Sequence, residues 1–171
     1  QNVFAGRSGG NLRSCDGIAI LEDAIEINLP SIQRHGVEIE RDYADVRLDL
    51  VTDPHKVLQI IVNLISNAVV ATRSKPDGDR HIWIRALRRE AEVVIEVEDD
   101  GEGIEEEDLV RIFQHGFTTR KDGHGFGLHS AAIAAQQLGG TLGVSSDGKG
   151  CGACFRLSLP AAVEEPTSCS V

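Results

Sequence analysis

Two glycine-rich stretches, DDGEGI at residues 99–104 and GHGFGL at residues 123–128, enclose the polar loop IFQHGFTTRK at residues 112–121. Glycine backbone bends freely and leaves room for another group to come close. Asp99 opens the first stretch, and a carboxylate there accepts a hydrogen bond from an exocyclic amine such as that of adenine. The neighbouring Asp100 is the competing carboxylate, and its position favours a turn residue. The arrangement predicts a nucleotide held by its base at the first stretch and by its phosphates beneath the loop.

The second glycine-rich stretch supplies features that attract phosphate. Gly127 leads directly into a predicted helix at residues 128–138, whose free N–H groups and positive dipole end bind anions. The spacing of the glycines is neither the dinucleotide pattern G-x-G-x-x-G nor a P-loop. A flexible surface loop that ends in a glycine-capped helix is the alternative interpretation. Hydroxyls and positive charge stand in the loop before the helix, at Thr118, Thr119, Arg120 and Lys121.

A long apolar helix is predicted from His55 to about Thr72, with Asp53 as its N-cap and Pro54 in its first turn. Polar groups on a buried helix need partners, because each unpaired group costs about 1–3 kcal/mol. The helix therefore lines a polar pocket, or else carries a set of satisfied core amides. Amide oxygens on its surface also suit Mg²⁺ beside a phosphate. The polar residues stand four positions apart and share one face: His55, Gln59, Asn63 and Asn67.

The bulk composition excludes several classes of protein. A chain of 171 residues with a net charge of −10 predicts one globular domain and no nucleic-acid partner, since that partner requires clustered Lys and Arg. No uninterrupted apolar run reaches the roughly 20 residues of a membrane helix. Cys151 and Cys154 lack a second pair at ligand spacing, so we expect no zinc site. This cysteine usage fits a reducing cytosol.

The order of the elements predicts an α/β sandwich of the α+β class, with one mixed five-stranded sheet covered on one face by about three helices. Residues 1–15 are expected to be a linker or an expression remnant, residues 16–160 the domain, and residues 161–171 a flexible tail. The absence of methionine, including at position 1, indicates a piece of a longer chain. Apolar periodicity places helices near residues 17–35, 55–72, 104–113 and 128–138, and strands near residues 37–41, 81–87, 93–98, 141–146 and 151–159.

Together these stretches resemble the catalytic and ATP-binding domain of sensor histidine kinases, within the superfamily of gyrases, heat-shock chaperones, histidine kinases and MutL proteins. The likeness covers residues 20–160, and the closing GACFRLSLP at residues 152–160 is similar to the last strand of that family. The matching boxes follow one another in order: NLISNA at residues 63–68, DDGEGI at residues 99–104, FQHGFTT at residues 113–119 and GHGFGL at residues 123–128.

The resemblance implies a Bergerat ATP-binding fold with ATP or ADP and Mg²⁺ as ligands. By this likeness Asp99 binds adenine, Asn67 coordinates Mg²⁺, and residues 114–126 form the lid over ATP. The implied partners are the histidine-bearing dimerisation domain of the same kinase and a response regulator receiver domain, with the catalytic portion in the cytoplasm. Catalysis is assigned to Asn63, Arg120 and Lys121. The implied nucleotide contacts are Asn67, Asp99, Gly101, Gly103, Ile104, Phe117, Thr118, Thr119, Gly123, Gly125, Gly127 and Leu128.

The chain departs from the family pattern at several points, one of them Val70, which stands where many members carry a polar or basic residue. ATP-hydrolysing members of the superfamily carry a Glu where this chain has Asn63, and an amide cannot accept a proton near neutral pH. Ala153 replaces the Thr that often follows Gly152, which removes a hydroxyl near adenine. No histidine in the chain is followed by an acidic residue, as the acceptor histidine is in this family. Asn63 favours phosphoryl transfer to a protein acceptor over hydrolysis by an ATPase, and we expect that acceptor to be a histidine outside this chain. An ATP-gated interaction module and a Ser/Thr kinase are the alternatives.

Overall fold

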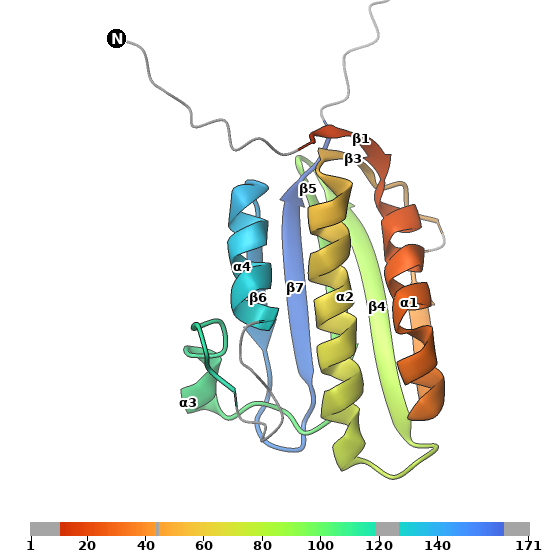
Figure 1. Ribbon diagram of the computed structural model, residues 1–171, viewed down its shortest axis with the longest axis vertical. Helices are drawn as coiled ribbons and strands as arrows, with labels where there is room; N and C mark the ends of the chain where they lie inside the picture. Colours follow the sequence, from red (N-terminus) through yellow and green to blue (C-terminus); the bar gives the residue numbers. More distant parts are fainter. Residues whose placement is uncertain (1–10, 44, 119–126, 163–171) are drawn as a thin grey trace, which may run out of the picture.

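The main sheet confirms the predicted architecture. The computed structural model describes residues 11–43, 45–118 and 127–162. In its main sheet β2 runs parallel to β4, and the other neighbouring strands are antiparallel (Figure 1). The mixed five-stranded sheet is therefore as expected. Its spatial order is β2 (Val37–Asp42), β4 (Arg80–Arg89), β5 (Glu92–Asp99), β7 (Ala153–Pro160) and β6 (Thr141–Ser145).

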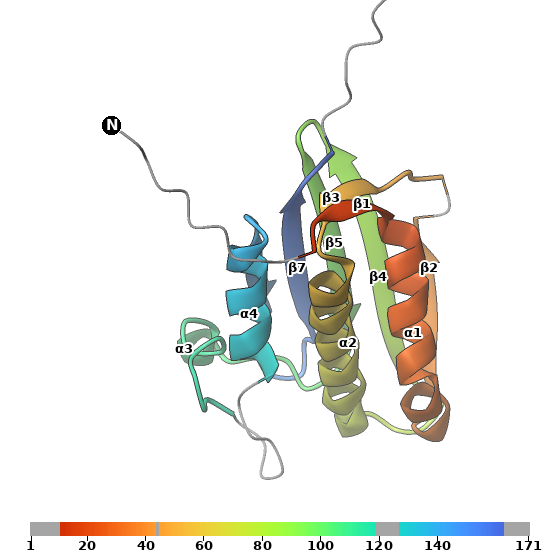
Figure 2. The ribbon, with the colours of Figure 1, turned by 45° about the horizontal axis from the view of Figure 1, so that its top comes forward.

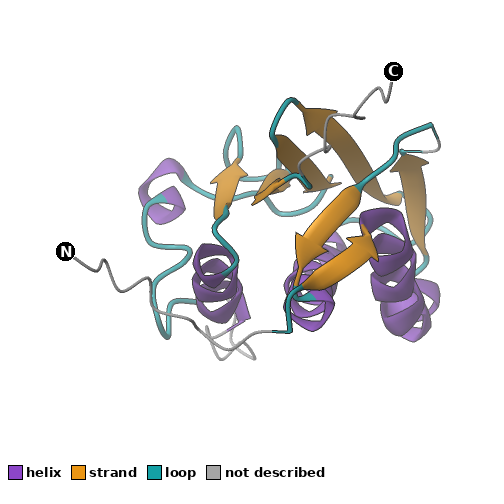
Figure 3. Ribbon diagram, turned by 90° about the horizontal axis from the view of Figure 1, so that it is seen from above, coloured by secondary structure: helices purple, strands orange, loops and turns teal. Residues whose placement is uncertain are grey.

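Within the described residues, three helices cover one face of this sheet, and Figure 3 shows the two layers end on. Strand side chains alternate between the two faces, so every second residue points toward the helices. Those positions are apolar and fully buried, as at Ile84, Ile95 and Leu157. Burying one such side chain stabilises the fold by about 1.5–3 kcal/mol relative to exposure. The covering helices are α1 (Gly17–Arg34), α2 (Pro54–Ala71) and α4 (Gly127–Gln137).

The central helix, α2, lies between α1 and α4 (Figure 1). The N–H of His55 donates to Asp53 Oδ1 at 3.1 Å, which confirms the predicted N-cap. The stretch Pro54–Ser74 has a mean hydropathy of 1.3 and is long and apolar enough, by length and composition, to cross a membrane. Half of it is buried inside this fold, where Leu64 and Ile65 are fully enclosed. In this structure α2 is a core helix.

Two short strands that the sequence patterns do not predict form a second, two-stranded sheet (Figure 2). β1 (Arg13–Asp16) pairs antiparallel with β3 (Asp49–Thr52). The N–H of Gly17 donates to Leu48 O at 2.7 Å, and a Cβ at Gly17 would lie only 2.9 Å from Leu48 Cβ. The pairing places residues 13–15 in the fold, whereas the sequence pattern assigns them to a linker.

The prediction of a helix at residues 104–113 is wrong for most of that range, where the structure has a single helical turn. The observed α3 is Glu106–Leu109, and turns follow it. None of the four residues is buried, and Val110 after them is 81% exposed. A helix this short depends on packing an apolar face, since its few backbone bonds do not repay nucleation. Without such a face the segment stops after one turn.

The two closely spaced cysteines are both free thiols. Cys154 lies in β7, where its Sγ is 3.5 Å from Glu96 Oε2. Burial and the Glu96 carboxylate raise the pKa of the Cys154 thiol to about 12, so the thiol stays protonated near neutral pH. Cys151 is exposed and precedes the strand, so the predicted strand at residues 151–159 begins two residues later than expected.

Candidate functional site

A cavity of about 540 Å³ opens between the end of β5, the second half of α2 and the start of α4. Asn63, the predicted catalytic residue on α2, lines it, whereas Gly101 does not. Thr119, Arg120, Lys121, Gly123 and Gly125 lie outside the described residues. The cavity brings together the remaining predicted nucleotide contacts: Asn67, Asp99, Gly103, Ile104, Phe117, Thr118, Gly127 and Leu128.

The carboxylate of Asp99 is held at one end of the cavity. Asp99 is the last residue of β5 and alternates with Val97 and Ile95, so it points to the helix-covered face. The side chain is only 3% exposed. Its Oδ1 accepts the N–H of Gly101 at 2.8 Å, which fixes the orientation of the carboxylate. An acceptor group is thus fixed against the cavity, with its surroundings largely closed to water.

The adjacent Asp100 is not among the cavity residues. Its carboxylate accepts from Lys75 Nζ at 2.7 Å and from the N–H of His81 at 3.1 Å. Partial burial raises the pKa of Asp100, but the bonds from Lys75 and His81 outweigh burial and hold the pKa below its ordinary value. Because the pKa is lowered, this stabilisation is present at neutral pH and is lost as the pH falls through the acid range. Asp100 therefore fastens the turn after β5.

The glycines after Asp99 allow backbone segments of the protein itself to touch. A Cβ at Gly101 would lie 2.3 Å from Ala71 O, at the end of α2. A Cβ at Gly103, where φ is +70°, would lie 2.0 Å from Gly148 O. The N–H of Glu102 donates to Ala71 O at 3.0 Å. The loop is therefore wedged between α2 and the β6–β7 loop, which fixes the cavity wall.

The opposite end of the cavity is formed by α2 and α4. Asn63 Nδ2 donates to Gly127 O at 3.5 Å, which joins the two helices. α4 begins at Gly127, and Gly127 and Leu128 both line the cavity. The N–H groups of the first turn, which have no partner within the helix, and the positive end of the helix dipole therefore lie beside it. This end of the cavity suits an anion.

The polar stripe of α2 is divided between two surroundings. Asn63 and Asn67 line the cavity, whereas His55 and Gln59 are exposed. Asn63 and Gln59 also line a second cavity of about 360 Å³, which is bordered by α1 at Ile27 and by α4. Two residues of the stripe, Asn63 and Asn67, thus form part of the wall of the nucleotide cavity, and none of the four is a fully buried core residue.

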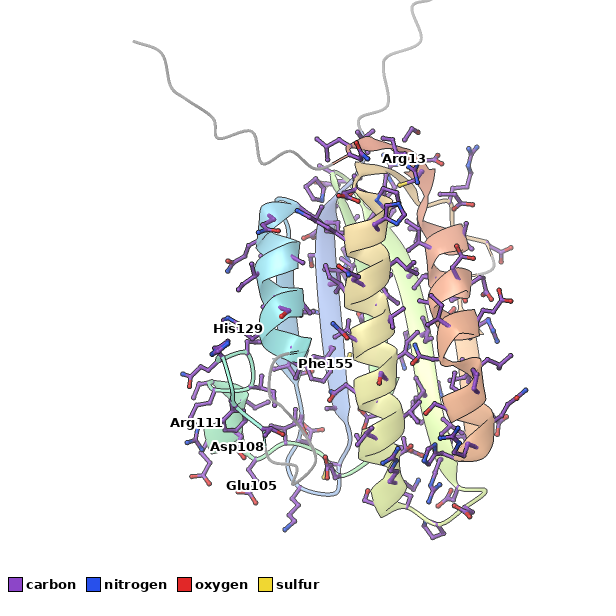
Figure 4. The ribbon with its side chains drawn as sticks, in the orientation of Figure 1. Arg13, Glu105, Asp108, Arg111, His129 and Phe155 are labelled. Atoms are coloured by element: carbon purple, nitrogen blue, oxygen red, sulfur yellow. The ribbon has the colours of Figure 1, made fainter. Side chains whose placement is uncertain are left out.

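Aromatic contacts hold the segment after α3 beside the cavity. The rings of Phe113 and Phe155 meet edge to face at 6.2 Å, and the guanidinium of Arg111 lies 5.2 Å from the ring centre of Phe117. His129 Nδ1, in the first turn of α4, donates to Phe113 O at 2.9 Å. Figure 4 shows Arg111 and His129 at this side of the molecule, with Phe155 in the sheet behind α4. These contacts place Phe117 at the cavity.

Several cavity residues carry no sequence signal. Lys149, in the loop between β6 and β7, supplies the one cation among the described lining residues. Ser66 also lines the cavity, one position before the predicted Asn67. A charged or polar residue in a turn is ordinary, so only the fold reveals that these side chains face the cavity. Acidic side chains line it as well, at Asp99, Glu102, Glu105 and Asp108.

Comparison with known proteins identifies the family. Residues 52–163 match the family described as "Histidine kinase-, DNA gyrase B-, and HSP90-like ATPase". The chain is 34% identical over 168 residues to the sensor protein ChvG of Rhizobium meliloti, covering 81% of this chain and 28% of that protein. It is 30% identical to the two-component sensor PprA of Pseudomonas aeruginosa, covering 95% of this chain and 18% of that protein. The chain thus spans less than a third of the length of these relatives.

Solved structures show the same fold. The catalytic domain of the histidine kinase ThkA superposes with a TM-score of 0.78 at 21% identity, covering 88% of this chain and 96% of that one. Full-length ShkA in complex with AMPPNP superposes with a TM-score of 0.79 at 25% identity, covering 92% of this chain and 32% of that one. The chain belongs to the family of histidine kinase-, DNA gyrase B- and HSP90-like ATPases, and it is an ATP-binding domain of the sensor histidine kinase type.

Proposed function

We propose that this domain binds Mg·ATP in the 540 Å³ cavity and donates the γ-phosphate to a histidine on a dimerisation domain outside this chain. One observation carries the proposal. A fixed carboxylate, Asp99, and a helix N-terminus, at Gly127, line the same cavity. The carboxylate accepts from the amine of adenine, and the helix end receives the phosphates. The volume is within the usual range for small-ligand sites, about 300–1,000 Å³.

The charges around the cavity favour a divalent cation with the nucleotide. The described lining carries four carboxylates against the single ammonium of Lys149. A polyphosphate entering such a site needs further positive charge, which Mg²⁺ supplies when bound. Asn67 is the residue suited to hold it, because an amide oxygen is a hard ligand and Mg²⁺ keeps several waters and phosphate oxygens. Asn63 lies one turn earlier on α2 and orients the start of α4.

In the proposed reaction the site positions the reactants, and residue 63 is an asparagine that cannot act as a general base. The Asn63 amide donates to Gly127 O, and an amide cannot accept a proton from water near neutral pH. The acceptor imidazole is its own nucleophile: its nitrogen bonds to the γ-phosphorus as the bond to the bridging oxygen breaks and ADP leaves. No histidine lines the described part of the cavity, so the acceptor comes from outside it. The phosphohistidine then donates its phosphoryl group to a receiver domain, on the cytoplasmic side where ATP is available.

We expect the isolated domain to bind Mg·ATP and to release no phosphate above the buffer background, because no group at position 63 activates water. Phosphate release from saturating Mg·ATP is measured together with nucleotide binding in the same sample. Binding without turnover supports a phosphate donor waiting for its acceptor. Sustained release by a sample that binds ATP contradicts the proposal and identifies an ATPase in which another residue activates water.

Asn67→Ala is expected to raise the Mg²⁺ concentration required for half-maximal ATP binding roughly tenfold, since it removes one oxygen ligand while water and phosphate retain the others. A magnesium titration of ATP binding measures the shift. Gln59→Ala is the matched control, because Gln59 lies on the same face of α2, is exposed and is absent from the nucleotide cavity. Superimposable titrations of Asn67→Ala and the wild-type domain contradict the assignment of the metal ligand.

A further inference from the structure

We infer that Ser146 is a positioning residue for the base end of the nucleotide site, an inference that rests on the function proposed above. Ser146 is absent from the cavity lining, and it follows the last residue of β6. Its hydroxyl accepts the N–H of Ile104 at 3.0 Å and the N–H of Gly148 at 3.3 Å, and it donates to Gly152 O at 2.5 Å. One donor and two acceptor sites of a serine hydroxyl are thereby all used.

One of these three bonds, from Ile104, joins the two loops that wall the base end, and the other two hold the Ser146 hydroxyl within its own loop. Ile104 belongs to the loop after β5, whereas Gly148 and Gly152 belong to the loop between β6 and β7. The two sides contribute different residues to the cavity: Gly103 and Ile104 from the first loop, and Lys149 from the second loop with Ala153, the first residue of β7. The spacing between these walls sets the room for a base beside Asp99. Ser146 therefore controls the width of the site without touching the ligand.

The two loops are also joined by backbone hydrogen bonds that do not involve Ser146. The fold of the loops therefore does not depend on the Ser146 hydroxyl alone. The N–H of Gly150 donates to Glu102 O at 2.6 Å, and the N–H of Gly152 donates to Gly101 O at 3.1 Å. These bonds do not involve a side chain and persist when the Ser146 hydroxyl is removed. Ile104 is different, because the bond that holds its N–H comes from the Ser146 side chain. Loss of the hydroxyl releases Ile104 at the cavity and leaves the crossing of the loops in place.

We expect Ser146→Ala to weaken ATP binding about tenfold and to reduce the preference for ATP over GTP, because a loosened wall discriminates less between bases. The dissociation constants for ATP and GTP are measured well below the melting temperature. A variant that is only less stable has a smaller folded fraction, which weakens the apparent binding of ATP and of GTP by the same factor. A change in the ratio of the two dissociation constants therefore indicates that Ser146 positions the base end of the site. Ser145→Ala is the matched control, since Ser145 is the exposed neighbouring residue of β6.

Two further variants keep the test decisive. Ser146→Thr retains the hydroxyl and is expected to retain the nucleotide preference. Where Ser146→Ala does not fold, Ser146→Cys replaces it, because a thiol has nearly the same shape and is a weak donor and acceptor. An unchanged ratio in Ser146→Ala, or in Ser146→Cys, overturns the inference. The ATP affinity of Asp99→Asn is measured in parallel. Wild-type affinity in that variant refutes the proposed function. A lower affinity in Asp99→Asn, together with an unchanged nucleotide preference in Ser146→Ala, refutes only the role of Ser146.

Discussion

Asp99→Asn is expected to weaken ATP binding roughly 10- to 100-fold, because a hydrogen bond to a charged acceptor is worth about 1.5–3 kcal/mol and tenfold in affinity corresponds to about 1.4 kcal/mol. The asparagine oxygen can still accept the N–H of Gly101, which holds Asp99 Oδ1 at 2.8 Å. Its amide nitrogen then faces the cavity. Because this nitrogen and the exocyclic amine of adenine are both hydrogen-bond donors, the bond between them is lost. Isothermal titration with ATP at saturating Mg²⁺ measures the loss.

Asp100→Asn provides the control for this experiment. Asp100 is a carboxylate at the next position, but it bonds to Lys75 and His81 and does not line the cavity. We expect Asp100→Asn to lower the melting temperature and to leave the ATP affinity of the folded domain unchanged. Equal losses of affinity in the two variants, or none in Asp99→Asn, contradict the placement of the base at Asp99.

Gly101→Ala is expected to cost about 2–4 kcal/mol of folding free energy and to abolish nucleotide binding, as overpacking and a lost hydrogen bond combine. The added Cβ would lie 2.3 Å from Ala71 O and 2.8 Å from the Thr72 nitrogen, and both are backbone atoms at the end of α2. Backbone cannot rotate away as a side chain does. The loop must shift, which breaks the bond from Glu102 to Ala71 O and moves Asp99 with it.

Thermal unfolding measures this effect, and for a domain of this size the melting temperature is expected to fall by roughly 5–15 °C. Gly143→Ala is the matched control. Gly143 lies in β6, and nothing stands within 4 Å of a Cβ built there. We expect it to melt at or above the wild-type temperature, since alanine restricts the unfolded chain more than glycine does. A Gly101→Ala domain as stable as Gly143→Ala would show that the loop can move aside freely.

The sequence predicts those parts of the fold that local chemistry determines. α2 begins where Asp53 and Pro54 indicate, because an N-cap acts within one turn. α1 ends before Gly36, which adopts a φ of +58° there, as a glycine after a helix commonly does. The β4–β5 hairpin turns at Glu90 and Ala91, between two alternating segments. The placement of Asp99 at the cavity follows from the same alternation.

The remaining features depend on segments that are distant in the chain. β1 exists because Arg13–Asp16 meets Asp49–Thr52, and four residues in isolation show no reliable period. Ser146 and Lys149 act through a loop that packs on Gly103, some forty residues earlier, and nothing in the turn itself indicates this contact. α3 ends after one turn because none of its four residues is buried against the fold. Each of these outcomes is decided by tertiary packing.

The two described ends of the domain meet at one corner. The N–H of Ala162 donates to Asp49 O at 3.2 Å, and Asp49 pairs with Asp16 of β1. β7 runs for eight residues from the nucleotide cavity toward this corner, a distance of about 26 Å at about 3.3 Å per residue. A tilt of about 10° at the corner therefore swings the cavity through about 4–5 Å at that strand length. For ATP bound as proposed, the orientation of the two-stranded sheet at this corner would therefore change the distance between the γ-phosphate and an acceptor outside the domain.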